Sequence, residues 1–204
     1  MTEVKGDKMQ GAPVLRDISD AGLMASLAAG DTAALAVLHQ RYARMICSLT
    51  LRLDPRGGLQ HAEDLTQEVF LTLYESAGRY RDEGKLKSWL CGITAQKTRS
   101  ARRRRTVRSG LMRANRSINP GHSSSYSAPV DERLSARSDV TEALLSLNDK
   151  QREVLVLHSI EGLSGEEIAE ALNIKTSAVW VRLHRARKTM AAALADTRPG
   201  RERR

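Results

Sequence analysis

The segment from Leu163 to Met190 constrains the fold more than any other part of this chain. Ser164 and Glu167 have the spacing of a capping box, so a helix is expected to begin at Ser164. Asn173 follows where a helix C-terminus needs a residue that tolerates left-handed backbone. Thr176 can then cap a second helix, whose inward stripe is Val179, Leu183, Ala186 and Met190. A short capped helix, a tight turn and a longer helix form a helix-turn-helix pattern.

The rest of the chain has the same helical spacing and an aliphatic composition. Apolar residues make up 41% of the 204 residues and aromatic residues only 3%, so the core must consist mainly of Leu, Val, Ile, Ala and Met. Apolar residues recur three or four positions apart, for example at Leu35, Leu38 and Tyr42, and no alternating strand pattern persists. The sequence therefore predicts an all-α fold.

Turn and linker signals divide the chain into two small helical domains. Residues 1–16 are expected to form a disordered lead-in, and helical periodicity then runs over 17–105. The periodicity is lost over 106–137, where Ser, Pro and Gly predict a flexible linker. It returns over 138–194 and ends before a frayed tail, 195–204. Two helical domains on a basic tether are predicted.

Four helices are expected in the first domain. Asp20 can cap one that ends near Gly30, and Asp31 or Thr32 can begin the second. Two more are expected at about residues 60–77 and 86–105.

Positive charge is concentrated in one stretch. The net charge is +9, but residues 84–130 contain eleven Lys and Arg and no Asp or Glu, so the remainder sums to −2. Such a segment on a slightly acidic protein indicates a polyanionic partner. A solvated basic linker explains residues 108–116 better than residues 85–105, where basic residues alternate with core-type residues.

The second helix of the helix-turn-helix pattern has a cationic face. Residues 139–170 contain eight acidic and two basic residues, whereas residues 175–188 contain five basic and no acidic residues. This contrast favours insertion of the helix into the major groove of DNA. For Trp180, packing in the core or between domains is an equal alternative. The expected DNA-contacting residues are Thr176, Ser177, Ala178, Trp180, Val181, Arg182 and Arg185.

The segment 61–75 carries four acidic residues and no Lys or Arg. Leu65, Val69 and Leu73 form an inward stripe, and the apolar surface extends well beyond it, so the helix is either deeply buried or meets a partner. Catalysis by its carboxylates is an alternative, but no His or metal-type cluster supports it. The candidate partner-binding residues are Asp64, Gln67, Glu68, Leu71 and Tyr74.

The segment 85–99 interleaves basic and apolar residues around Trp89. A basic surface beside an aromatic ring suits binding of an opened single strand. Trp89 is explained at least as well as a core anchor, with strand binding around it. The candidate strand-binding residues are Lys85, Lys87, Trp89, Gln96, Lys97, Arg99, Arg102 and Arg103.

No feature predicts a metal, a cofactor or a membrane span. Cys47 and Cys91 lack CxxC spacing and nearby His ligands, so free thiols in a reducing cytoplasm are expected. No apolar stretch approaches the roughly 20 residues that span a bilayer. The N-terminus has no signal-peptide pattern, so a cytoplasmic location is expected.

Several stretches together resemble the sigma-70 class of bacterial RNA polymerase subunits, most closely its extracytoplasmic-function (ECF) branch. They are AEDLTQEVFLTLY, Ser88–Leu90, Leu147–Leu157 and LSGEEIAEALNIKTSAVWVRLHRAR. The resemblance implies two domains, region 2 and region 4, joined by a linker. It also implies that polymerase performs the chemistry, so no catalytic residue or metal is expected. Relatives often have other residues at the positions of Leu86, Gln96 and Trp180.

The resemblance further implies a division of labour. The helix with Asp64 would dock on the β′ clamp helices of core polymerase, whose β subunit is also an expected partner. The linker would thread toward the active-site channel or RNA exit path. Residues 80–105 would recognise and help melt the −10 promoter element, and the helix from Thr176 would read the −35 element. An anti-sigma factor is an expected partner. A stand-alone helix-turn-helix regulator is the alternative, but it would typically be a two-fold dimer, whereas a monomer is expected here.

Overall fold

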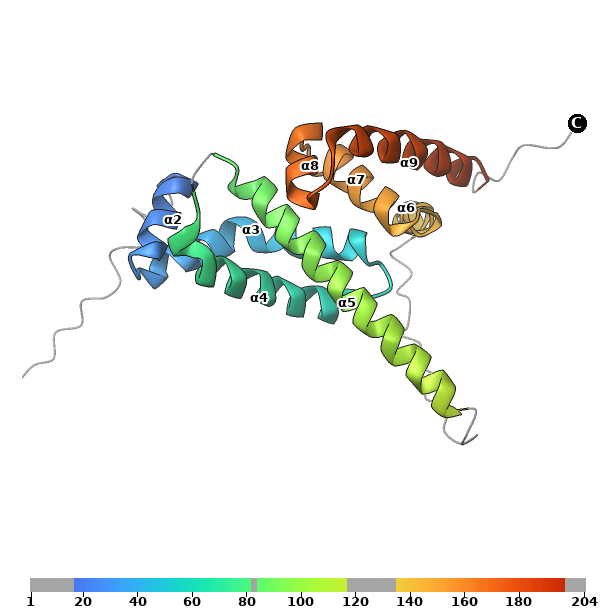
Figure 1. Cartoon of the computed structure of the whole chain (residues 1–204), viewed down its shortest axis with the longest axis horizontal. Coiled ribbons are helices and arrows are strands. Elements are labelled where there is room, and N and C mark those ends of the chain that lie inside the picture. The colour runs from blue at the N-terminus through green and yellow to red at the C-terminus, as the bar shows by residue number, and fades with distance from the viewer. Residues whose placement is uncertain (1–16, 82–83, 117–134, 197–204) are drawn as a thin grey trace, which may run out of the picture.

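The computed structural model describes residues 17–81, 84–116 and 135–196. Within these ranges the chain forms α-helices and one short 3-10 helix and has no strand, which confirms the all-α prediction. The remaining parts of the predicted lead-in, linker and tail lie outside the described residues. The elements in chain order (Figure 1) are α2 (Asp20–Ala28), α3 (Thr32–Leu53), α4 (Gly58–Ser76), η1 (Ala77–Arg79), α5 (Leu86–Arg116), α6 (Ser135–Ser146), α7 (Asp149–Ser159), α8 (Gly165–Leu172) and α9 (Thr176–Asp196).

The first helix is capped by a different residue from the one predicted. The Ser19 hydroxyl accepts a hydrogen bond from the Gly22 N–H at 3.2 Å, so Ser19 is the N-cap of α2 and the prediction of Asp20 was wrong. Asp20 instead binds Arg41 at 2.6 Å and accepts a hydrogen bond from the Tyr42 hydroxyl, both on α3. Adjacent Ser and Asp are equally good caps in isolation, and the tertiary contacts of Asp20 decide between them.

Helix α5 is longer than the apolar spacing predicts. It continues past Arg105 to Arg116, and α6 begins at Ser135, so both helices enter the range 106–137 that was predicted as linker. The added residues of α5 include good helix formers such as Arg, Leu, Met and Ala. Apolar periodicity reports contact with a core, and a helix can continue without it where one side no longer packs.

The helices of the N-terminal half, α2 to α5, enclose an aliphatic core. It includes Leu23, Leu38, Val69 and Leu90, and Phe70, the only Phe in the chain, is its aromatic member apart from partly buried rings at the margin. A second core lies within the C-terminal half, α6 to α9.

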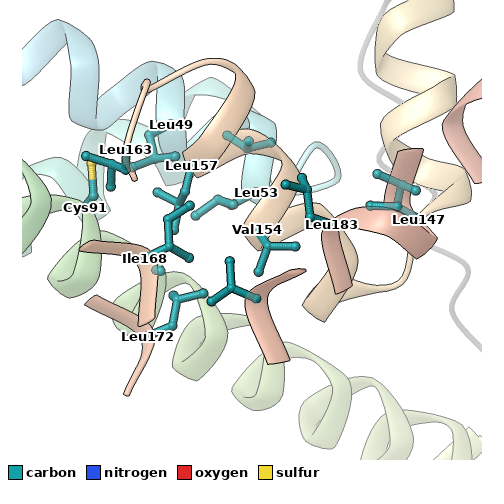
Figure 2. Close-up of a cluster of buried hydrophobic side chains, with 14 of the residues drawn as sticks. Leu49, Leu53, Cys91, Leu147, Val154, Leu157, Leu163, Ile168, Leu172 and Leu183 are labelled. Carbon is teal, nitrogen blue, oxygen red and sulfur yellow. The ribbon is translucent and has the colours of Figure 1, made fainter. Parts of the chain in front are cut away.

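The second core extends into the N-terminal half (Figure 2). Leu49 and Leu53 of α3, with Cys91 and Ala95 of α5, are buried together with residues of α7, α8 and α9. Burial of one Leu side chain contributes about 1.5–3 kcal/mol to the stability of the fold. Because Leu49 and Leu53 are both buried here, the contact between the halves stabilises the fold substantially. We call this contact the seam. The prediction of two helical domains on a basic tether did not include a contact between the domains.

Candidate nucleic-acid interface

The helix-turn-helix is formed by α8, the turn at Asn173 and α9. The Ser164 hydroxyl accepts from the Glu167 N–H at 3.2 Å, and the Glu167 carboxylate accepts from the Ser164 N–H at 2.8 Å. Both arms of the predicted capping box are therefore confirmed. Asn173 ends α8 with φ 51° and ψ 57°, which confirms the predicted left-handed residue.

Helix α9 begins at Thr176 itself, so Thr176 is its first residue and not the predicted cap. The Lys175 carbonyl accepts the first helical hydrogen bonds, from Ala178 and Val179. The predicted inward stripe is confirmed, because Val179, Leu183 and Ala186 are buried and Met190 packs partly buried against the same core.

The predicted DNA-contacting residues of α9 lie on its solvent side. Ser177, Trp180, Val181 and Arg185 are exposed, and Thr176, Ala178 and Arg182 are partly exposed. We call these seven residues the α9 face.

Trp180 packs against neighbouring residues and also remains partly open to solvent. One edge of its indole packs on Gly165, where an added Cβ would come within 2.6 Å of the ring. Its ring also lies edge-on to His158, with centroids 5.8 Å apart. The side chain nevertheless remains 48% exposed. Gly165 and His158 thus hold the ring in place while its outer side stays open.

The predicted strand-binding residues lie on the first part of α5 and just before it. We call Lys85, Lys87, Trp89, Gln96, Lys97, Arg99, Arg102 and Arg103 the basic face. Gln96, Arg99 and Arg103 are exposed, whereas Lys97 is partly exposed and lies 3.7 Å from the Glu68 carboxylate on α4. Trp89 is partly buried against the N-terminal core, with its ring centroid 5.2 Å from that of Tyr80. This packing matches the core-anchor interpretation of Trp89.

Basic residues at the N-terminal end of this face contact α8 and the loop that precedes it. The Lys85 amine lies 3.1 Å from the Glu170 carboxylate, and the Lys87 amine donates to the Glu161 carbonyl. A groove of about 660 Å³ lies alongside, between α5 and α8, with Trp89 and Gln96 on its α5 side.

Farther along α5, two arginines meet carboxylates of α7. Arg99 lies 3.0 Å and Arg102 3.5 Å from the Glu153 carboxylate. Arg102 also lies 2.8 Å from Asp149 and donates to the Leu53 carbonyl at 3.0 Å. The Arg102 side chain is only 13% exposed as a result.

The contacts of α7 include two buried ionic residues that the sequence interpretation missed. Arg152 donates to the main-chain carbonyls of Leu144, Leu147 and Leu53 at 2.7, 2.8 and 3.3 Å. Burial lowers the pKa of Arg152, and the neighbouring Asp149 carboxylate opposes that shift. Burial likewise raises the pKa of Glu153, although Arg99 and Arg102 counteract it. The available signal was the charged pair Arg152 and Glu153 directly before the apolar run Val154–Leu157.

A separate surface lies on α4. Leu65, Val69 and Leu73 are buried, which confirms the predicted inward stripe. On the other side, Leu71 is 60% and Tyr74 47% exposed although both are apolar. We call the predicted partner-binding residues the α4 face; Asp64 and Gln67 are also exposed, and Glu68 is partly exposed.

The described residues contain no group of three His, Cys, Asp or Glu side chains arranged to hold a metal. In the same ranges, no helix combines the length and apolar character needed to cross a bilayer. Both cysteines are free, and burial raises the pKa of the Cys91 thiol to about 12.

Comparison with known proteins matches both halves to one family. Residues 38–108 match the family model of sigma-70 region 2, and residues 137–190 match that of sigma-70 region 4. RNA polymerase sigma factor CarQ of Myxococcus xanthus is 32% identical over 148 residues, which cover 72% of this chain and 82% of CarQ. ECF RNA polymerase sigma factor SigD of Mycobacterium tuberculosis is 34% identical over 171 residues, which cover 80% of this chain and 78% of SigD.

Solved structures agree in fold. CnrH, in complex with the cytosolic domain of CnrY, is 25% identical and superimposes with a TM-score of 0.64, covering 88% of this chain and 99% of CnrH. The sigma factor RpoE of Bartonella quintana, in complex with the anti-sigma factor NepR, is 21% identical with a TM-score of 0.60, covering 78% and 96%. The chain therefore belongs to the sigma-70 family, in its ECF branch, and is a sigma factor of bacterial RNA polymerase.

Proposed function

We propose that three surfaces of this sigma factor divide promoter recognition among themselves. The α4 face binds the β′ clamp helices of core polymerase, the basic face of α5 binds the −10 element, and the α9 face reads the −35 element. The observation that carries this assignment is the presence on one chain of an exposed acidic-apolar surface and two separate basic surfaces.

The α4 face has the composition of a protein interface. Leu71 and Tyr74 project apolar surface into solvent, and Asp64, Gln67 and Glu68 surround them with polar groups. An apolar centre with a polar rim is typical of a protein–protein interface. Because α4 packs through Leu65, Val69 and Leu73, it can present this face without rearranging.

The basic face is suited to a nucleic-acid strand with unpaired bases. Its Lys and Arg side chains supply phosphate contacts, and Gln96 lines the groove beside Trp89, where a base could be held. Trp89 would act chiefly as the wall of that site, since its ring packs against Tyr80.

The α9 face is suited to duplex DNA. Thr176, Ser177 and Ala178 lie in the first turn of a helix whose opposite side is buried, so they would meet base edges in the major groove. Arg182 and Arg185 follow one and two turns later and would contact bases or phosphates.

The partners follow from the same assignment. CnrH and RpoE were each solved with a bound protein, named as an anti-sigma factor in the case of RpoE. We infer that a protein of the anti-sigma class binds this chain as well, and that the free chain is a cytoplasmic monomer. Core polymerase, and not this chain, carries out catalysis. Membership of the sigma-70 family does not favour the alternative of a stand-alone regulator.

Transcription with purified components tests the assignment. Core polymerase is supplied with the promoter upstream of this chain's own gene, with and without the protein. Initiation that requires the protein is expected, and Leu71→Glu should abolish it because a buried carboxylate at the interface is costly. Glu75→Gln, an exposed change on the same helix, is the matched control and should be active. Equal activity of Leu71→Glu and the wild type would remove the α4 face from the proposal.

A further inference from the structure

The α9 face carries two large apolar side chains that remain open to solvent. Trp180 is 48% and Val181 is 51% exposed, although residues 175–188 contain five basic and no acidic residues. Covering exposed apolar surface is favourable, so these side chains add affinity for the molecule that the face binds. We call Trp180 and Val181 the apolar pair.

Val181 stands at the centre of the solvent side of α9. It is two positions from the buried Val179 and two from the buried Leu183, and a two-residue step turns a helix by about 200°. Its side chain therefore points away from the core, in line with the exposed Ser177 one turn earlier. When α9 enters a major groove with this side, Val181 meets the floor of the groove, where the base edges lie.

Trp180 is held at the margin of the same side by two other helices. A Cβ atom added at Gly165 of α8 would lie 2.6 Å from the Cζ2 atom of Trp180, and the ring centroid lies 5.8 Å from that of His158 on α7. A ring that is fixed before binding loses little conformational entropy when DNA covers it. It also presents an apolar surface of fixed shape, which can admit one base and exclude another.

The chemistry of the apolar pair favours one base. In the major groove each base pair presents its own pattern of donors and acceptors, and only thymine adds a methyl group. The Val181 side chain has no hydrogen-bonding group, and an indole ring is apolar apart from its N–H. Such side chains read a base by apolar contact with the thymine methyl group, whereas Arg182 and Arg185 of the same helix suit guanine.

We propose that the apolar pair makes this sigma factor select thymine at one or two neighbouring positions of the −35 element, by contact with the 5-methyl group. This inference rests on the proposed function, in which the α9 face reads the −35 element. It assigns this base selection to apolar contact in place of hydrogen bonds to the base edges. It also makes Gly165 a positioning residue, because Gly165 determines where the Trp180 ring lies.

The experiment uses holoenzyme assembled from core polymerase and the full-length chain. Duplex promoters are offered with a randomised −35 element and the constant −10 element of the promoter upstream of the chain's own gene, and the bound fraction is sequenced. Each enriched thymine is then replaced by deoxyuridine, which pairs with adenine in the same way and lacks only the 5-methyl group. The measured quantity is the ratio of the affinities for the thymine duplex and the deoxyuridine duplex.

The wild type should bind the thymine duplex about fourfold more tightly than the deoxyuridine duplex, the ratio expected for burial of one methyl group. In Trp180→Ala and in Val181→Ala, the ratio should fall towards one at the thymine that each side chain contacts. Val140→Ala is the matched control, because Val140 is 48% exposed on α6 and lies outside the α9 face. Its ratio should equal that of the wild type.

Gly165→Ala tests the positioning separately and leaves Trp180 unchanged. Its added methyl group must displace the indole ring, so the ratio at the thymine that Trp180 contacts should fall. Gly78→Ala, whose added Cβ meets no atom within 4 Å, should keep the wild-type ratio. Circular dichroism checks that each variant is folded. Because Val181 is exposed, Val181→Ala keeps the test decisive if a change at Trp180 or Gly165 prevents folding.

Three results would overturn the proposal. The first is a −35 element in which other bases are enriched and thymine is not, and the second is a ratio of one in the wild type. The third is a wild-type ratio in both folded Trp180→Ala and Val181→Ala, because an equal loss on both duplexes would place the apolar pair on the sugar–phosphate backbone. If no sequence is enriched over the −35 element, the assignment of the α9 face fails instead.

Discussion

The two basic surfaces of this chain differ in what faces them. The α9 face is exposed or partly exposed along its length, with Trp180, Val181 and Arg185 open to solvent. The basic face of α5 is in contact with carboxylates of the other half of the chain at Arg99 and Arg102. Both surfaces have the composition of a DNA-binding site, but only the basic face is paired with carboxylates of the other half of the chain. Composition identifies a binding surface, and packing decides whether it is available.

The largest expected effect concerns Arg152 of α7, which donates hydrogen bonds to main-chain carbonyls of α3 and of the end of α6. Arg152→Ala should lower the free energy of unfolding by about 3 kcal/mol, because the carbonyls of Leu144, Leu147 and Leu53 lose a buried donor. Urea denaturation measures the loss. Lys150→Ala, two residues away and exposed, should stay within about 0.5 kcal/mol of the wild type. Equal effects of the two changes would show that Arg152 is dispensable to the seam.

The open surface gives the next largest effect. Arg182→Ala should weaken binding of a duplex that carries the −35 element by about 1–3 kcal/mol if Arg182 makes a bidentate contact to guanine. The loss should be the same in the wild-type and Gly92→Ala backgrounds, because the α9 face is open in both and distant sites are additive. Gly92→Ala is used to open the seam, because a Cβ atom added at Gly92 would meet the backbone of Ala171 on α8. Fluorescence anisotropy with the labelled duplex measures it. A loss that depends on the background would mean that the seam also limits the α9 face.

The basic face, whose Arg99 is already paired across the seam, should respond differently. Arg99→Gln should reduce single-strand affinity about tenfold in the Gly92→Ala background, where Arg99 can reach a phosphate. In the wild type, where Arg99 is paired with Glu153 at 3.0 Å, the loss should be clearly smaller. Arg103→Gln is the control. Because Arg103 is exposed, this change should lower the single-strand affinity by the same factor in both backgrounds. If Arg99→Gln also lowers the single-strand affinity by the same factor in both backgrounds, pairing with Glu153 does not limit the contact of Arg99 with the strand.

The smallest effect is a pH dependence of the seam. Burial raises the pKa of Glu153, against the lowering influence of Arg99, Arg102 and Arg182, and Asp149 raises it further. At pH values between the unfolded and the raised folded pKa, the folded protein therefore keeps a proton that the unfolded chain has released. Stability should fall as the pH rises from about 4.3, the ordinary Glu value, through the raised pKa, and should then level off.

Urea unfolding of Glu153→Gln across that pH window checks the assignment. The neutral amide cannot release a proton. The part that Glu153 contributes to the slope of the free energy of unfolding against pH should therefore disappear. Glu166→Gln, on the exposed side of α8, should keep the wild-type slope. Retention of the full slope in Glu153→Gln would assign it to another group.

Local structure was predictable wherever a few neighbouring residues determine it. The capping box of Ser164 and Glu167 and the left-handed Asn173 depend on contacts within one turn, and both were predicted. The end of α5 was not, because the apolar spacing stops near Arg105, whereas α5 continues through the exposed residues 106–108 to Arg116. The choice between Ser19 and Asp20 as a cap also depended on a tertiary contact, that of Asp20 with Arg41.

The seam could not be predicted for a related reason. Its ion pairs join residues far apart in sequence, such as Lys85 with Glu170, and any acidic helix could have matched the charge of α5. The feature that selects α8 is steric: Gly92 lets the Ala171 backbone approach. A glycine within a helix can have many explanations, so its meaning becomes clear only when its neighbour is known.

Zero-length carbodiimide cross-linking of the full chain tests directly whether the two halves meet at the seam in solution. Mass spectrometry would compare the Lys85–Glu170 link across the seam with the Lys97–Glu68 link inside the N-terminal half, whose charged atoms lie 3.1 Å and 3.7 Å apart. A closed seam should give both links in the wild type. Gly92→Ala should lose only the first, because its added Cβ would lie 2.8 Å from the Ala171 carbonyl oxygen. Formation of the Lys97–Glu68 link alone in the wild type would contradict a closed seam.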